Sequence, residues 1–134
     1  PNTKYRTVRY GNVLYSTGSV LCKWKDRILN DEELIVTDPS ATRFYWSIEQ
    51  AIDLIFNCLH NATDSSPYVP EMKSMAVGDL MEAMIRKYMP EGNQRKVKEI
   101  GLQPGENLHE VIIEGGPTSF DVDRFSIEEI MELV

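Results

Sequence analysis

The chain has 134 residues, of which 42% are hydrophobic, and its formal net charge is −7. This composition allows one domain with one core, and the negative charge argues against general nucleic-acid binding. No apolar run reaches the roughly 20 residues of a membrane span, and no basic-then-apolar leader opens the sequence, so we expect a soluble, cytoplasmic protein with no membrane or nucleic-acid partner.

The charge is unevenly distributed along the chain. Residues 1–27 hold six basic side chains and one acidic one, whereas the remainder holds eight basic and twenty acidic side chains. This pattern favours a small anion near the start of the chain over an extended nucleic-acid backbone.

Cysteine and histidine usage argues against disulfide or metal chemistry. Cys22 and Cys58 have no partner cysteines at metal spacing, which indicates reduced thiols in a reducing compartment. His60 and His109 are far apart, and neither has a second ligand at metal spacing. We therefore expect no metal site.

A polar turn near the start of the chain is the first candidate site. Residues 7–24 read TVRYGNVLYSTGSVLCKW. Residues 7–10 favour a strand, Gly11 and Asn12 predict its end, and residues 16–19 predict a turn before a helix. Exposed N–H groups at such a junction suit a phosphate. The alternative is an α/β turn without a ligand, in which Asn12 only shapes the turn.

Apolar periodicity predicts four helices. They cover residues 19–29, residues 47–60, residues 77–89 and a short segment after Ser126. Capping-box patterns mark the start of the second helix, at Ser47 and Gln50, and of the last, at Ser126 and Glu129. In the second helix the apolar residues at helical spacing are Ile48, Ala51, Ile52, Leu54, Ile55, Cys58 and Leu59.

Few strands are predicted between these helices. Residues 34–37 form a short β-branched run, residues 97–102 favour an extended conformation, and residues 68–69 are compatible with a short strand. Residues 108–113 are apolar, but their pattern does not distinguish helix from strand. The expected fold class is therefore mixed α/β with few, short strands.

Three further features suggest binding chemistry. Arg43 precedes the aromatic run at residues 44–46, where a guanidinium can bind phosphate bidentately, and the alternative is an ion pair with an acid. Trp24 and the aromatic run can stack on a base or fill the core. Glu106 and Glu110 would share a face on one helical turn, and the alternative is two solvated acids.

Four segments taken together resemble a known family. VRYGNVLYSTGSV, VTDPSATRF, YVPEMKSM and GLQPGENLHE occur in that order across residues 4–113. They resemble the C-terminal part of the UDP-N-acetylglucosamine 4,6-dehydratases, nucleotide-sugar enzymes of the extended short-chain dehydrogenase/reductase superfamily. Each segment is weakly specific alone, and the four are specific jointly.

The resemblance implies roles for several residues. Asn12 would contact the nucleotide diphosphate, Arg43 would hold the phosphate, and Gln103 and Glu106 would lie near the phosphate and ribose. The backbone and side chains around three further residues would cover the uracil: Leu21, Cys22 and Trp24. The sequence also departs from the family, which usually has Arg at Thr17, Pro at Cys22, and Arg and Lys at Gln103 and Asn107. Each lost hydrogen bond to a charged group weakens binding by about 1.5 to 3 kcal/mol.

The resemblance also implies what lies outside this chain. Family members bind NAD or NADP through an N-terminal glycine-rich unit and use a Tyr-x-x-x-Lys pair, and neither pattern occurs in the sequence. The expected organisation is thus a substrate-binding lobe over residues 1–134 with the last strand region of a nucleotide-binding domain, and the cofactor-binding half elsewhere. No catalytic residue is assigned to this chain.

The intact enzyme would oxidise C4 of the sugar by hydride transfer, eliminate water across C5 and C6, and return the hydride to C6. Some members also epimerise C5, and homo-oligomers are common. The expected function is therefore UDP-sugar binding within such an enzyme of polysaccharide biosynthesis. The alternative is a non-catalytic interaction module that keeps the shape of the lobe.

Overall fold

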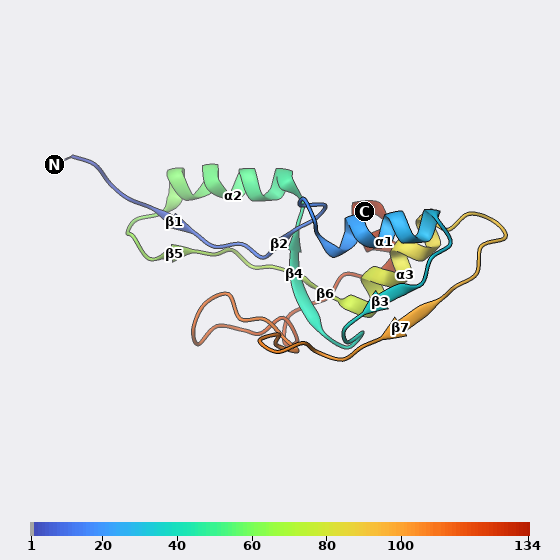
Figure 1. The fold of residues 1–134 in the computed structure, drawn as a ribbon. Helices are drawn as coiled ribbons and strands as arrows, with labels where there is room; N and C mark the ends of the chain where they lie inside the picture. Colours follow the sequence, from blue (N-terminus) through green and yellow to red (C-terminus); the bar gives the residue numbers. More distant parts are fainter. Residues whose placement is uncertain (1) are drawn as a thin grey trace.

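Short strands and four helices alternate along residues 2–134, which are the residues that the computed structural model describes (Figure 1). In chain order the elements are β1 (Thr7–Val8), β2 (Asn12–Val13), α1 (Val20–Leu29), β3 (Leu34–Val36), β4 (Thr42–Trp46), α2 (Ile48–Asn61), β5 (Pro67–Tyr68), β6 (Ser74–Ala76), α3 (Val77–Tyr88), β7 (Val97–Glu99) and α4 (Ile127–Leu133). The predicted mixed α/β class with few, short strands is confirmed.

The strands form three small sheets. β4 is the middle strand of the largest, with β2 parallel to it on one side and β6 antiparallel on the other. β1 pairs in parallel with β5, and β3 pairs in parallel with β7. In Figure 1, β4 runs between the part that holds α2, β1 and β5 and the part that holds α1, α3, β3 and β7.

The core lies between helices α1, α3 and α4. Helix α3 packs against both other helices, and α1 also packs on β3. The side chains at the centre are nearly inaccessible to solvent: Leu21, Trp24, Leu80, Met84 and Ile130. The Trp24 Nε1–H donates a 2.9 Å hydrogen bond to the carbonyl oxygen of Ile35, so its polar atom is satisfied inside the core.

The helix predictions are confirmed, including both capping boxes. In each box the serine hydroxyl accepts from the backbone N–H three residues on, and that residue's side chain accepts from the serine N–H. These boxes start α2 after Ser47 and α4 after Ser126. Local sequence therefore determines where these helices begin.

The strand predictions were incomplete. The first strand is shorter than predicted: β1 ends at Val8, Gly11 lies in the break that follows, and Asn12 begins a second strand, β2. A Cβ at Gly11 would lie 2.3 Å from the Phe44 carbonyl oxygen, so this glycine permits close approach to β4. The central strand β4 and its neighbour β6 were not predicted, although Thr42 to Trp46 is rich in β-branched and aromatic residues.

The structure decides two points that the sequence left open. Residues 108–113 form neither helix nor strand, with only an isolated bridge between Val111 and Thr118, so Glu106 and Glu110 do not share a helical turn. In α2 only part of the apolar set is buried, and Ile48, Ile52, Ile55 and Leu59 are exposed together with Phe56.

Candidate functional site

Asn12 and Arg43 lie on one face of the sheet around β4. Asn12 is the register partner of Tyr45, and Arg43 precedes Tyr45 by two residues. Because side chains alternate along strands and paired residues share a face, the three side chains are on the same side. The structure thus brings together the two residues that sequence reasoning placed at the diphosphate.

The Asn12 amide is held by two acceptors. Its Nδ2 donates to the Phe44 carbonyl oxygen at 3.1 Å and to the Glu110 carboxylate, with 3.1 Å to Oε1. These contacts fix the orientation of the amide, although Asn12 itself is exposed. A ligand that takes a hydrogen bond from Nδ2 must therefore share it with Glu110 or displace that carboxylate.

Arg43 is oriented by several contacts. Its Nη1 donates to the carbonyl oxygens of Thr42 at 2.8 Å and Leu108 at 3.0 Å, and its Nε lies 3.6 Å from Glu110 Oε1. The side chain is only 15% exposed. Among the described residues Nη2 has no acceptor, so this nitrogen is the part of the guanidinium that can reach an external anion.

Glu110 connects these residues. Its carboxylate accepts from Asn12 and from the Phe44 backbone N–H at 3.0 Å, besides the ion pair with Arg43. β2 pairs with β4 at Tyr45 and Trp46, so it does not cover the edge at Phe44. Glu110 satisfies the N–H there. Sequence reasoning gave Glu110 no such role, because 98 residues separate it from Asn12.

A buried hydroxyl network holds Glu110 in place. Ser119 is fully buried, and its Oγ accepts from the Glu110 N–H at 2.8 Å and lies 2.7 Å from Thr42 Oγ1. Thr42 Oγ1 also lies 2.7 Å from Nδ1 of His109, whose ring packs against Phe120. The network fastens residues 108–120 to β4, and it gives His109 a structural partner.

Tyr45 shares the face of Asn12 and Arg43. Its burial, reinforced by the negative charge of Glu110, raises the pKa of the phenol to about 12, and the charge of Arg43 opposes this shift. The Tyr45 hydroxyl therefore stays protonated at neutral pH and is a neutral hydrogen-bonding group.

The three residues expected around the uracil differ in accessibility. Leu21 and Trp24 are only 1% and 2% exposed and lie in the core, so neither residue presents a surface to a base. Cys22 is half-buried, and its Sγ lies within 4.0 Å of the Tyr15 and Ser16 carbonyl oxygens. Trp24 therefore fills the core, which is one of the two alternatives that the sequence left open for it.

Gln103 and Glu106 lie in an exposed turn. The Gln103 N–H donates to Glu106 Oε2 at 2.7 Å, and Gln103 Nε2 donates to the Gly101 carbonyl oxygen at 3.0 Å. The chain then reaches β4 at Leu108, whose carbonyl oxygen accepts from the Thr42 N–H at 2.9 Å. Gln103 and Glu106 thus precede the segment that contacts Thr42 and Arg43. Among the described residues, neither of the two side chains contacts Asn12 or Arg43 directly.

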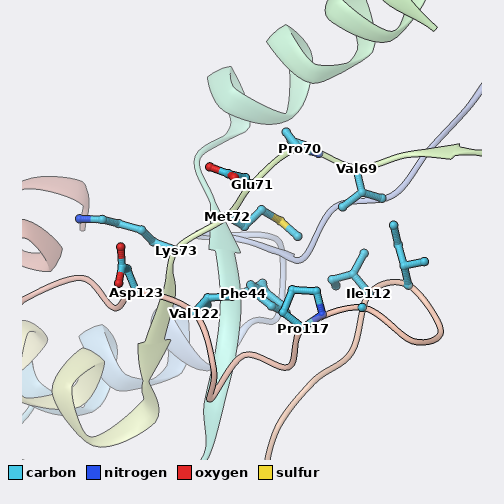
Figure 2. A pocket seen from close by; sticks show the side chains of 12 residues that line it. Phe44, Val69, Pro70, Glu71, Met72, Lys73, Ile112, Pro117, Val122 and Asp123 are labelled. Carbon is cyan, nitrogen blue, oxygen red and sulfur yellow. The ribbon is translucent and has the colours of Figure 1, made fainter. Parts of the chain in front are cut away.

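A cavity of about 730 Å³ lies beside β4 (Figure 2). Its wall is mostly apolar, with charged groups from Glu71, Lys73 and Asp123. The full lining comprises Phe44, Val69, Pro70, Glu71, Met72, Lys73, Ile112, Ile113, Gly116, Pro117, Val122 and Asp123. Because Phe44 alternates with Arg43 along β4, the cavity is on the face opposite to Asn12 and Arg43.

Residues 2–134 contain neither a metal-binding cluster nor a membrane-spanning helix. No cluster of three or more histidine, cysteine, aspartate or glutamate side chains in this range is arranged to hold a metal ion. Within the same residues, every helix is too short or too polar to pass through a lipid bilayer.

Comparison with known proteins identifies the family. Residues 1–131 match the model of the family described as polysaccharide biosynthesis protein, so the chain belongs to that family. It is 32% identical over 112 residues to a UDP-N-acetylglucosamine 4,6-dehydratase (inverting) of Campylobacter jejuni, which covers 83% of this chain and 31% of that protein. The resemblance found in the four sequence segments is thereby confirmed.

Two further similarities extend over nearly the whole chain. A protein of Methanocaldococcus jannaschii named as an uncharacterized membrane protein is 30% identical, over 98% of this chain and 39% of that protein. The X-ray structure of Pen from Bacillus thuringiensis superposes with a TM-score of 0.87 at 27% identity, over 98% of this chain and 49% of that one. The chain therefore spans about a third to a half of the length of these proteins.

Proposed function

We propose that the chain binds the nucleotide part of a UDP-sugar, as the substrate lobe of a 4,6-dehydratase acting on UDP-N-acetylglucosamine. The observation that carries this proposal is the placement of Asn12 and Arg43 on one face of the β2 and β4 pair, both oriented by Glu110. Two fixed donors on one face suit the oxygens of a diphosphate. The similarity to the Campylobacter jejuni dehydratase supports the choice of sugar nucleotide.

Within this proposal the residues have separate tasks. Asn12 Nδ2 and Arg43 Nη2 donate to the diphosphate, while Cys22 and the accessible residues around Leu21 and Trp24 border the uracil. Gln103 and Glu106 lie toward the phosphate and ribose. Residues 1–134 then form the substrate lobe together with the last strands of a nucleotide-binding domain.

The cofactor belongs to another part of such an enzyme. NAD or NADP needs a glycine-rich turn that opens a helix, and the left-handed glycines in residues 2–134 lie in separate turns: Gly18, Gly92, Gly101, Gly105 and Gly115. These residues do not form a dinucleotide cradle, and we assign no hydride-transfer step to this chain. Its proposed contribution is to bind and orient the substrate.

A titration tests the proposal. The protein is a chimera in which this chain replaces the matched half of the Bacillus thuringiensis protein, and UDP-N-acetylglucosamine is titrated calorimetrically. We expect saturable binding that Arg43→Met weakens at least about tenfold, since a hydrogen bond to a charged group contributes about 1.5 to 3 kcal/mol. The control Lys98→Met removes an exposed cation on β7, outside the proposed site, and should leave the affinity unchanged.

A second candidate function is a non-catalytic interaction module. The Glu110 carboxylate already engages Asn12 and Arg43, and Thr17, Gln103 and Asn107 replace cations that the resembled enzymes carry. The Glu110 carboxylate would repel a diphosphate unless the attraction by the Arg43 guanidinium is stronger than this repulsion. Absence of saturable binding in the folded chimera would exclude the UDP-sugar proposal and favour this module.

A further inference from the structure

Two buried hydroxyl groups connect His109 to β4, and we call His109, Thr42 and Ser119 together the hydroxyl network. Thr42 alternates with Arg43 along β4, so its side chain lies on the opposite face of the sheet. Thr42 Oγ1 lies 2.7 Å from His109 Nδ1 and 2.7 Å from Ser119 Oγ. Thr42 and Ser119 are fully buried, so their hydroxyl protons must be directed at partners within the protein.

The Ser119 hydroxyl has one proton and two lone pairs for three neighbours. Its Oγ accepts from the Glu110 N–H at 2.8 Å and donates to the Thr42 carbonyl oxygen at 2.9 Å. Its remaining lone pair must therefore accept from the Thr42 hydroxyl. If the Ser119 proton pointed at Thr42 Oγ1 instead, the contact with the carbonyl oxygen would hold no proton and would bring lone pairs together.

The same counting determines which nitrogen of His109 carries a proton. Because the Thr42 hydroxyl gives its proton to Ser119, its oxygen must accept at the 2.7 Å contact with His109. Nδ1 is thus the donor, and in the neutral ring Nε2 carries no proton. The hydroxyl network therefore runs in one direction, from His109 Nδ1 to the Thr42 carbonyl oxygen.

The neighbours of His109 on both sides hold Arg43. The Leu108 carbonyl oxygen accepts from Arg43 Nη1 at 3.0 Å, and Glu110 Oε1 lies 3.6 Å from Arg43 Nε. The Thr42 carbonyl oxygen, where the hydroxyl network ends, accepts from the same Nη1 at 2.8 Å. The contacts that orient the guanidinium thus come from residues that the hydroxyl network fastens together.

We propose that His109 is a positioning residue of the diphosphate site, whose Nδ1–H holds residues 108–110 on β4 so that Arg43 keeps its orientation. The inference rests on the proposed function, in which the Arg43 guanidinium binds the diphosphate. His109 acts through Thr42, from the opposite face of β4, and does not contact the ligand. A donor that is already held in its bound orientation gains affinity because less freedom is lost on binding.

Two substitutions at position 109 separate the hydrogen bond from the packing of the ring. His109→Phe keeps a ring beside Phe120, at a present centroid distance of 4.7 Å, and loses the donor. His109→Asn loses the ring and keeps an amide N–H near the position of Nδ1. Calorimetry with the chimera should show affinity for UDP-N-acetylglucosamine at least about threefold weaker in His109→Phe, a factor within the range of one hydrogen bond, and close to wild type in His109→Asn.

NMR of the ligand-free chimera gives a readout that packing alone would not change. The ¹⁵N spectrum of the neutral His109 ring should show a protonated Nδ1 and an unprotonated Nε2, with the exposed His60 ring as reference. The Arg43 Nε–H signal should shift in His109→Phe and return to its wild-type position in His109→Asn. If His109→Phe does not fold, Thr42→Val replaces it, and Thr42→Ser then takes the place of His109→Asn.

An unprotonated Nδ1 in the neutral ring would overturn the proposal. So would wild-type affinity in the variant without the hydrogen bond, or equal weakening in both variants with an unchanged Arg43 signal, because His109 would then serve packing alone. The NMR readouts do not depend on ligand. If they appear as expected and the folded chimera binds no UDP-N-acetylglucosamine, the proposed function fails, while the positioning of Arg43 by His109 stands.

Discussion

The Glu110 carboxylate oxygen Oε1 lies 3.1 Å from Asn12 Nδ2, which joins two residues from opposite ends of the chain. The same carboxylate accepts from the Phe44 N–H and pairs with Arg43. Glu110 is therefore both a structural link along β4 and the counter-charge of the candidate diphosphate site. Its two roles lead to separable predictions.

Substituting Glu110 should destabilise the fold. Glu110→Gln keeps one oxygen acceptor and loses the negative charge, so we expect a loss of about 1 to 3 kcal/mol in the free energy of unfolding. Urea denaturation measures it, with the exposed Glu114→Gln as the matched control. If both variants unfold at the same urea concentration as the wild type, the carboxylate does not link Asn12, Phe44 and Arg43.

Gly11 should not tolerate a side chain. A Cβ there would lie 2.3 Å from the Phe44 carbonyl oxygen and 2.6 Å from the Phe44 Cβ, so β2 would have to move away from β4. Overpacking of this kind costs about 1 to 3 kcal/mol, and we expect Gly11→Ala to lower the melting temperature. Gly18→Asn serves as control because Gly18 has open space around it, and asparagine tolerates its φ of 76°. An unchanged melting temperature for Gly11→Ala would refute the close approach.

The buried Ser119 hydroxyl should contribute to stability. Ser119→Ala leaves the Glu110 N–H without its 2.8 Å acceptor and removes a partner of Thr42. An unsatisfied buried group costs about 1 to 3 kcal/mol, which thermal unfolding followed by circular dichroism would detect. The exposed Ser65→Ala should be neutral. Equal unfolding of the two variants would mean that the network does not fasten residues 108–120 to β4.

The acid limb of the stability curve should depend on Glu82. Its pKa is lowered chiefly by the hydrogen bond from Arg86 and further by Arg95, whose Nη1 lies 2.6 Å from Glu82 Oε2. Because the folded-state pKa lies below the unfolded value, this contribution is present above about pH 4 and is lost as pH falls through the folded pKa. Glu82→Gln should therefore flatten the decline of melting temperature below that pH, whereas the exposed Glu91→Gln should not. Parallel curves for wild type and Glu82→Gln would contradict this contribution.

Local patterns predicted the elements that local interactions determine. The capping boxes at Ser47 and Ser126 are formed within four residues, and both helices begin where the sequence indicated. β4 was missed because it is stabilised by pairing with β2 and β6, which lie far away in the sequence. The exposure of Ile52 could not be predicted either, because apolar spacing shows that a helix has a packing face but does not show what covers it.

Some features of the candidate site were likewise predictable from the sequence, and others were not. Asn12 and Arg43 were recognised from residue type and motif, and their common face follows from the register of β2 and β4. Glu110 was not given a role because its contacts depend on residues 108–110 following the edge of β4. Core burial of Leu21 and Trp24 likewise depends on how α1 packs on α3 and β3.

Residue-resolved NMR of the ¹⁵N-labelled chimera, with and without UDP-N-acetylglucosamine, tests the central claim most directly. Binding at the proposed face predicts saturable shifts of the Asn12 side-chain amide and the Arg43 Nε–H signal, with the indole signal of buried Trp24 unchanged. Saturable shifts confined to residues around the cavity, such as Val69 and Lys73, or no shifts in the folded protein, would contradict the assignment of the diphosphate to Asn12 and Arg43.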